Sequence, residues 1–194
     1  MAASMILAID GATVSGFALG APRTIPKVDK HRLKKPSEDT WLVADGAARF
    51  VRDICFIEST RPDLIAIEAL MPNFNSNDER EGERQVQRSA ASMLTPPLIM
   101  GAVRGIAACY GITVVQVYPA TWRKHYLGRA NFGSREATKA QTISRGIALG
   151  YLPKGCKDDN MADAAGVWSW AECVHGRAIP RELSLHDQGA FRHG

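Results

Sequence analysis

The stretch "LIAIE" (Leu64–Glu68) decides the fold, because four apolar residues in succession end in a carboxylate. A short apolar run without polar alternation is typical of a strand that is buried on both faces of a sheet. The N-terminal stretch "ILAID" (Ile6–Asp10) repeats the pattern. The sequence therefore predicts two core strands that each end in an acid, Asp10 and Glu68.

The rest of the chain predicts an α/β fold. "GFALG" follows the first strand after a short turn, so we expect an antiparallel hairpin, and the polar residues 24–33 suit a third strand at a sheet edge. Further patterns predict helices at 37–60, about 86–110, 134–150 and 158–176, a short helix or loop at 120–128, and a fifth strand at 112–119. Strands joined by helical crossovers are parallel, so we expect a mixed five-stranded sheet, three strands antiparallel and two parallel, flanked by helices.

The two strand-end acids suggest a metal site. If the first strand is central and pairs with the fourth, Asp10 and Glu68 lie side by side at the carboxyl ends of the strands, where sites of such sheets gather. Neighbouring carboxylates repel one another unless a cation holds them, and hard divalent cations prefer carboxylate oxygens. The pair therefore indicates Mg²⁺ or Mn²⁺. The alternative is that each acid caps a helix or meets an arginine, and for either acid alone this alternative is the stronger.

A third acidic stretch, "DDNMADAAG" (158–166), strengthens the metal interpretation. Asp159, Asn160 and Asp163 can share one face of a helix. The alanines and the glycine around Asp163 have little bulk, so this helix can approach the sheet closely and bring Asp163 near the strand acids. The alternative is that Asp158 or Asp159 only caps the helix and that Asp163 is exposed.

The charge distribution offers candidate phosphate contacts. The net charge of +4 and the pI of about 9.0 are only mildly basic, but residues 23–35 hold six Lys/Arg and one Asp. A second basic cluster lies within residues 123–129. The candidate DNA contacts in these clusters are Lys30, Arg32, Lys34, Lys35, Arg123 and Arg129. A solvated hairpin face is an equal alternative for the first cluster.

The composition bounds the class of protein. The 194 residues and the 45% apolar content suit one domain, which we place at residues 1–176, with a tail at 177–194. No apolar run reaches the roughly 18 residues that cross a bilayer, and the N-terminal residues lack a signal-peptide pattern. The four cysteines form no CxxC pair, which favours free thiols in a reducing compartment. We expect a cytoplasmic protein.

Five stretches, taken in order, resemble a known family. "AIDGATVSGFAL", "IAIEAL", "VYPATWRK", "SREATKAQ" and "DDNMADAA" resemble the RuvC family of Holliday-junction resolvases, in the RNase H-like superfamily. The resemblance covers about residues 5 to 174, nearly the whole chain. Each motif is short, and the specificity lies in their order and spacing. Their divergence points to a phage or bacterial member, and the resemblance implies an RNase H-like fold.

The resemblance implies a set of metal ligands. It assigns Asp10, Glu68 and Asp163 as metal-binding, catalytic acids that hold two Mg²⁺ (or Mn²⁺) per active site. The fourth ligand position of the family, an acid or a histidine, falls on Asn160, where this chain departs from the pattern. Asn160 can still bind an ion through its carbonyl oxygen, or Asp159 can take its place.

The resemblance also implies a reaction and an assembly. Lys124 and Lys139 match catalytic lysines near the scissile phosphate. The alternative for both is an ordinary surface lysine, and for Lys139 this alternative is equally strong. The implied reaction is two-metal hydrolysis of DNA phosphodiesters at four-way junctions by a homodimer. Phe74, in the polar segment after Glu68, either inserts into an opened junction or packs on the core.

Other functions compatible with the same residues remain open. A nuclease of this fold can act on flaps, other branched DNA or RNA–DNA hybrids. A DNA-binding module that has lost its chemistry is a second alternative, with Asn160 as a symptom. "DGATVSG" (10–16) also resembles the phosphate loop of actin-like ATPases, but those need two such domains, for which the chain is too short.

Overall fold

The computed structural model describes residues 4–69 and 90–176 of the chain. Its strands are β1 (Ile6–Ile9), β2 (Val14–Gly20), β3 (Lys27–Arg32), β4 (Leu64–Glu68) and β5 (Thr113–Val117). Its helices are α1 (Leu42–Phe56), the 3-10 helix η1 (Glu58–Thr60), α2 (Ala90–Cys109), α3 (Pro119–Leu127), α4 (Arg135–Ala148) and α5 (Asp159–His175). The helix predicted for 37–60 is shorter than expected, because turns precede Leu42 and an extended residue, Ile57, follows Phe56.

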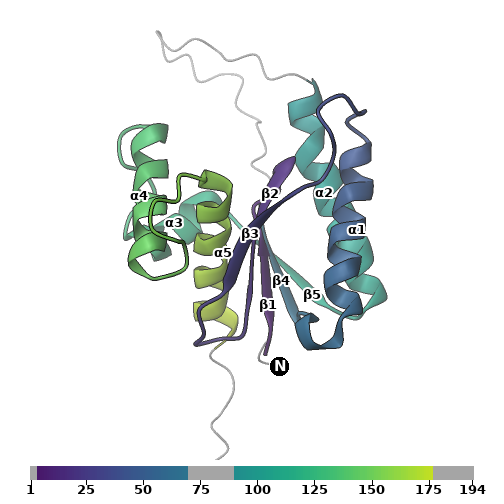
Figure 1. The fold of residues 1–194 in the computed structure, drawn as a ribbon, viewed down its shortest axis with the longest axis horizontal. Coiled ribbons are helices and arrows are strands. Elements are labelled where there is room, and N and C mark those ends of the chain that lie inside the picture. The colour runs from purple at the N-terminus through teal and green to yellow at the C-terminus, as the bar shows by residue number, and fades with distance from the viewer. Residues whose placement is uncertain (1–3, 70–89, 177–194) are drawn as a thin grey trace, which may run out of the picture.

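The strands form one sheet in the order β3-β2-β1-β4-β5. β1 pairs antiparallel with β2 and β2 with β3, whereas β4 pairs parallel with both β1 and β5. The predicted mixed five-stranded sheet is therefore confirmed, with β1 in its centre beside β4. Helices α1 and α2 cover one face of the sheet, and α5, with α3 and α4 beyond it, covers the other (Figure 1).

The central strands are buried on both faces, and alternate side chains enter different cores. One core joins α1 and α2 to the sheet residues Leu7, Ile9, Ile65 and Ile67. The other joins α3 and α5 to Ile6, Ala8, Leu64 and Ala66. Because side chains alternate with a period of two, Asp10 and Glu68 continue the second set. Both acids therefore project towards the α5 side of the sheet.

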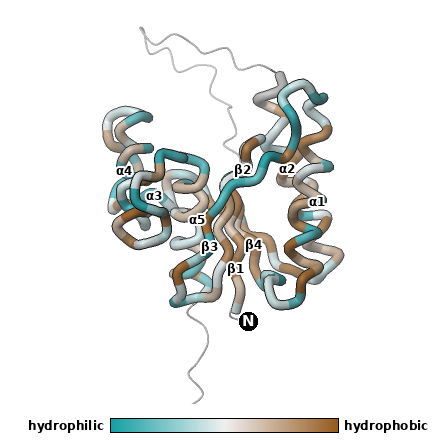
Figure 2. The backbone as a smooth tube through the Cα atoms, in the orientation of Figure 1, coloured by the Kyte–Doolittle hydropathy of each residue, from teal (hydrophilic) through white to brown (hydrophobic). Residues whose placement is uncertain are grey.

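The strand β3 forms a polar edge. Five of its six residues, all except the half-buried Val28, are exposed, and Figure 2 shows β3 largely teal beside the brown central strands. Charged side chains protect such an edge from pairing with another chain. All four cysteines are unpaired, as expected. Among the described helices, none combines the length and apolarity that crossing a bilayer requires.

Helix α5 packs very closely on the sheet. Its capping residue, Asp158, accepts a hydrogen bond from the backbone N–H of Met161 at 3.1 Å. A Cβ atom added to Gly16 of β2 would lie 1.9 Å from the backbone oxygen of Asn160, so this contact is possible only for glycine. The small residues that surround Asp163 are buried, as the sequence predicted: Ala162, Ala164, Ala165 and Gly166.

Substituting Gly166 with alanine tests this close packing. Its Cβ would lie 2.4 Å from Cζ3 of Trp122, a ring atom with no freedom to withdraw because Trp122 is fully buried. We expect Gly166→Ala to lower the free energy of unfolding by about 1–3 kcal/mol. The matched control is Gly105→Ala in α2, where nothing lies within 4 Å of the added Cβ and a gain of about 0.5–1 kcal/mol is expected. Urea denaturation measures both, and equal effects would contradict the prediction.

Candidate active site

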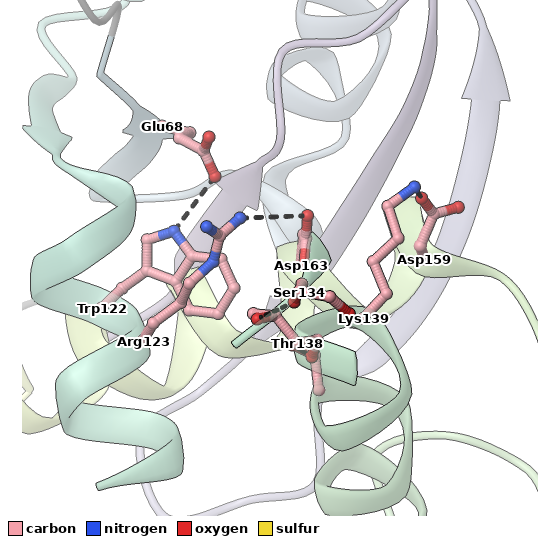
Figure 3. A network of polar contacts seen from close by, with 9 residues as sticks. Glu68, Trp122, Arg123, Ser134, Thr138, Lys139, Asp159 and Asp163 are labelled. Carbon is pink, nitrogen blue, oxygen red and sulfur yellow. Dashed lines mark hydrogen bonds and ion pairs between the residues drawn. The ribbon is translucent and has the colours of Figure 1, made fainter. Parts of the chain in front are cut away.

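The three predicted acids come from three elements that meet at one edge of the sheet. Asp10 follows β1, Glu68 ends β4, and Asp163 lies in the second turn of α5. The parallel register pairs Ile9 with Ile67, so the next residues, Asp10 and Glu68, are neighbours. Figure 3 shows Glu68 and Asp163 on either side of the Arg123 guanidinium.

Asp10 is held by the turn that follows it. Its Oδ1 accepts hydrogen bonds from the backbone N–H of Ala12 at 3.0 Å and from the hydroxyl of Ser15, which is fully buried, at 2.9 Å. Burial raises the pKa of Asp10 from 3.8 to about 7. Hydrogen bonds from Ala12, Gly16 and Ser15 oppose this rise, and repulsion from Asp163 adds to it.

Asp163 is turned inwards, with a side chain only 22% exposed. The alternative that Asp163 is an exposed residue of a solvated helix face is therefore wrong. Burial, followed by repulsion from Glu68, raises its pKa from 3.8 to about 7. Arg123 opposes this rise, because its Nη2 lies 3.9 Å from Oδ2 of Asp163.

Glu68 has one defined partner, Trp122 of α3. The indole Nε1–H donates to Oε2 of Glu68 at 3.0 Å (Figure 3). Burial raises the pKa of Glu68, while the hydrogen bond from Trp122 and the charge of Arg123 act in the opposite direction. Trp122 is fully buried, and its contact with a predicted catalytic acid was not foreseen from the sequence.

These contacts define a compact acidic cluster. Repulsion acts between Asp163 and Asp10 and between Asp163 and Glu68, so Asp163 lies within the electrostatic reach of both other acids. Within the described ranges, no three His, Cys, Asp or Glu side chains already surround a common point where an ion could sit. Asp10 and Glu68 instead accept hydrogen bonds from protein donors, and Asp163 forms an ion pair with Arg123. The donor set of buried carboxylate oxygens nevertheless suits a hard divalent cation, which would relieve the repulsion.

The remaining candidate ligands lie at the start of α5. Asp159 forms an ion pair with Lys139 of α4, and this hydrogen bond lowers the pKa of Asp159 (Figure 3). Asn160 meets the sheet through its backbone oxygen, at Gly16. The charge of Asp159 raises the pKa of Asp163 and that of Lys139 lowers it, so this pair borders the cluster.

The structure separates the neighbours Arg123 and Lys124. Arg123, predicted as a DNA contact, faces Asp163. Lys124, predicted to lie near the reacting phosphate, is exposed and lines a shallow hollow with Trp170 and Val174 at the far end of α5. Successive helical residues point about 100° apart, so with Arg123 facing the acids the side chain of Lys124 is directed elsewhere in this structure.

The other predicted DNA contacts lie on the surface or outside the described ranges. Arg32 and Lys35 are exposed, and Lys30 is exposed but pairs with Asp158. The Lys34 Nζ donates to the backbone oxygens of Lys35 and Glu38.

Arg129 and Phe74 complete this set. The guanidinium of Arg129 stacks over Phe132, with Cζ 4.2 Å from the ring centroid. Phe74 lies outside the described residues, so neither interpretation of it is tested.

Sequence reasoning missed two partners of the acids, Ser15 and Trp122. Ser15 lies five residues after Asp10 across a turn, and its hydroxyl reaches back to the carboxylate. A signal for Trp122 did exist, because a buried indole N–H usually finds an acceptor. Which acceptor it finds depends on how α3 lies against β4, and no local pattern gives that.

Comparison with known proteins places the fold. No protein-family model and no curated protein sequence matches the chain. Among solved structures, Thermus thermophilus RuvC is similar, with 16% identity and a TM-score of 0.60 over 88% of this chain and 97% of that chain. The fold is RuvC-like. T. thermophilus RuvC in complex with a Holliday junction substrate gives 17% identity and a TM-score of 0.59, covering 88% and 96%. The yeast mitochondrial Holliday junction resolvase Ydc2 gives 16% and 0.53, covering 86% and 77%.

The raised pKa values predict how the stability of the metal-free protein depends on pH. Between about pH 4 and 7, Asp10 and Asp163 keep protons in the folded state that they lose in the unfolded chain. The free energy of unfolding should therefore fall as the pH rises through this window, by up to about 1.4 kcal/mol per pH unit for each carboxyl, and level off above it.

Urea denaturation in EDTA from pH 5 to 8 measures this slope. Asp10→Asn removes one titrating group and its repulsion of Asp163, so the slope should become shallower. Asp53→Asn, at an exposed position of α1, should leave the slope unchanged. A wild-type slope of zero or of opposite sign would contradict the prediction.

Proposed function

We propose that this chain is a divalent-metal-dependent endonuclease that cleaves branched DNA, with the four-way junction as its substrate. The observation that carries the proposal is the cluster of three inward-facing carboxylates from β1, β4 and α5. Such a cluster is unfavourable without a cation, so the fold keeps it at a cost in stability. The RuvC-like fold, and a similar structure that is described with a Holliday junction substrate, support the choice of DNA.

In this proposal Asp10, Glu68 and Asp163 hold two Mg²⁺ (or Mn²⁺), and Asn160 or Asp159 completes the set. The ions, when bound, activate a water molecule and stabilise the leaving oxygen. Ser15 and Ala12 fix the Asp10 carboxylate through their hydrogen bonds.

The cations around the cluster act on the substrate. Lys139, at the border of the cluster, offsets charge on the phosphate as it becomes pentacoordinate. Lys124, which is exposed, serves this role only after its side chain turns towards the acids.

Basic side chains flanking the acids would bind the DNA backbone. Lys30 ends in an ion pair with Asp158, the capping residue of the helix that carries Asp163, so β3 lies beside the site. Arg32 at the end of β3, Lys35 in the turn after it and Arg129 just after α3 are also exposed and would add to the basic surface. Backbone contacts read DNA shape rather than sequence. A homodimer would cut two opposed strands symmetrically, so we propose that assembly.

Asp10→Asn tests the proposed chemistry. With Mg²⁺, wild-type protein should cut a four-way junction into nicked duplexes. Asp10→Asn should slow cleavage by at least about 100-fold, since several kcal/mol of charge stabilisation are lost. Asp53→Asn should cleave normally. A labelled panel of junction, flap, duplex and RNA–DNA hybrid, with mapped cut sites, measures both rate and substrate.

The outcomes of the panel separate the alternatives. Faster cleavage of flaps or hybrids than of junctions would replace the proposed substrate while keeping the chemistry. Junction binding without cleavage by the wild-type protein would indicate a non-catalytic module. If the Asp10→Asn variant still cleaves the junction, the acidic cluster takes no part in the reaction.

A further inference from the structure

Trp122 contacts the elements that carry two of the acids. Its indole N–H donates to Oε2 of Glu68, at the end of β4. Its six-membered ring lies against Gly166 of α5, where an added Cβ would come within 2.4 Å of Cζ3. Gly166 is three residues after Asp163, nearly one helical turn away. The ring is fully buried, so it connects Glu68 to the helix of Asp163 without a mobile link (Figure 3).

We propose that Trp122 is a positioning residue that orients the Glu68 carboxylate for a divalent cation, an inference that rests on the proposed function. A glutamate has three rotatable side-chain bonds, and a hydrogen bond to one oxygen fixes the direction of the other. Within the described part of the chain, Oε1 of Glu68 accepts no hydrogen bond from the protein. Donors behind carboxylate ligands of this kind typically change metal affinity by about 10–100-fold.

A second buried tryptophan provides a matched comparison. Trp168 of α5 is also fully buried in the core that contains Trp122. Its Nε1 has no hydrogen-bond partner among the described residues. The same core thus holds one indole whose N–H is paired with an acid and one whose N–H is unpaired. Removing the N–H from each separates the effect on Glu68 from the general effect of losing an indole.

The histidine substitution separates the hydrogen bond from packing. A histidine ring has Nε2 at the ring position that Nε1 occupies in tryptophan, so Trp122→His retains a donor but loses the fused ring. Trp122→Phe retains more ring volume but loses the donor. If Trp122 acts by packing, Trp122→Phe is the milder change; if it acts by orienting Glu68, Trp122→His is the milder change for metal binding.

The experiment is Mn²⁺ binding measured by electron paramagnetic resonance at pH 8, with the melting temperature recorded for each variant. We expect Trp122→Phe to weaken Mn²⁺ binding by about 10–100-fold, and Trp122→His to stay within a few-fold of wild type despite a lower melting temperature. Trp168→Phe should match wild type. Junction cleavage by Trp122→Phe should recover at raised metal concentration.

Other results would overturn the inference. Trp122 would have only a packing role if Trp122→Phe leaves the Mn²⁺ affinity unchanged. The same conclusion would follow if Trp122→His binds Mn²⁺ more weakly than Trp122→Phe does. Asp10→Asn serves as the reference for the site itself. If wild type binds no Mn²⁺, or Asp10→Asn binds it equally well, the proposed function fails, and the inference fails with it.

A different contact, that of Arg123, carries a second inference. Its guanidinium lies between Glu68 and Asp163 in Figure 3, with Nη2 3.9 Å from Oδ2 of Asp163. Its Cζ lies 5.0 Å from the centroid of the Trp122 ring. Its Nε is buried and finds no hydrogen-bond partner in the described ranges. Arg123 is therefore held mainly by charge and by the aromatic face, an arrangement from which it can withdraw.

We infer that Arg123 is an internal counter-ion of the metal-free site and competes with the divalent cation. Removing a positive charge beside the carboxylates should then strengthen Mn²⁺ binding, at least about threefold, even though a contact is lost. The same change should lower the melting temperature in EDTA, because Asp163 loses its nearby cation. The variant is Arg123→Gln, and the control is Arg104→Gln, which removes the same charge from an exposed position on α2.

The sign of the change in affinity decides this inference. Unchanged or weaker Mn²⁺ binding by Arg123→Gln would overturn it. Weaker DNA binding with unchanged Mn²⁺ affinity would assign Arg123 to the phosphate backbone instead. If the wild-type protein binds no Mn²⁺, the proposed function itself fails, and not only the inference about Arg123.

Discussion

The burial of three neighbouring carboxylates, with repulsion between Asp163 and the other two, is the constraint on which the rest of this structure depends. Asp10, Glu68 and Asp163 are each turned into the protein, where a charge without a partner is costly. The fold offsets part of this cost with local donors: the Ser15 hydroxyl, the Trp122 indole and the Arg123 guanidinium. The compensation is incomplete, and under the proposed function a divalent cation would offset the remaining cost. Replacing buried charged groups with well-packed hydrophobic residues is often neutral or stabilising, so stability alone does not explain the three acids.

The sheet and α5 bring these acids together by simple geometry. The parallel pairing of β1 with β4 aligns the ends of two strands, and the two-residue period of a strand sends Asp10 and Glu68 to the same face. The third acid reaches that face only because α5 lies against the backbone of β2 at Gly16. A larger residue at that point would push the first turn of α5 outwards, and Asp163 with it. The small residues of the fold are therefore as much a part of the site as its charged ones.

The fold class and the three acids could be predicted from the sequence, but the residues that contact the acids could not. Two apolar runs that end in acids, and a helix with small residues around a third, are local patterns. They predicted the mixed sheet, and they predicted that the acids meet if the first strand is central and pairs with the fourth, as it does. The partners depend on how one element is rotated against another. Arg123 and Lys124 are adjacent and similarly charged, yet the rotation of α3 turns the first towards Asp163 and the second into an outer hollow. The family resemblance placed Lys124 beside the reacting phosphate, and nothing in the nine residues of α3 shows by sequence how that helix is rotated.

Helix α3 is the element that links the acids to the surrounding charge. Trp122 donates a hydrogen bond to Glu68 and packs on α5. The guanidinium of Arg123, which faces Asp163, lies over the Trp122 ring. Trp122 therefore favours an ordered Glu68 carboxylate, and Arg123 supplies a positive charge that acts on both Glu68 and Asp163. An acidic cluster alone would repel the phosphate backbone of DNA. With Arg123 inside the cluster and Lys139 at its border, the metal-free site is less negative than its carboxylates alone would make it. If a divalent cation displaces Arg123 from Asp163, that positive charge becomes available to a phosphate as the ion binds, so that metal binding and DNA binding would favour each other.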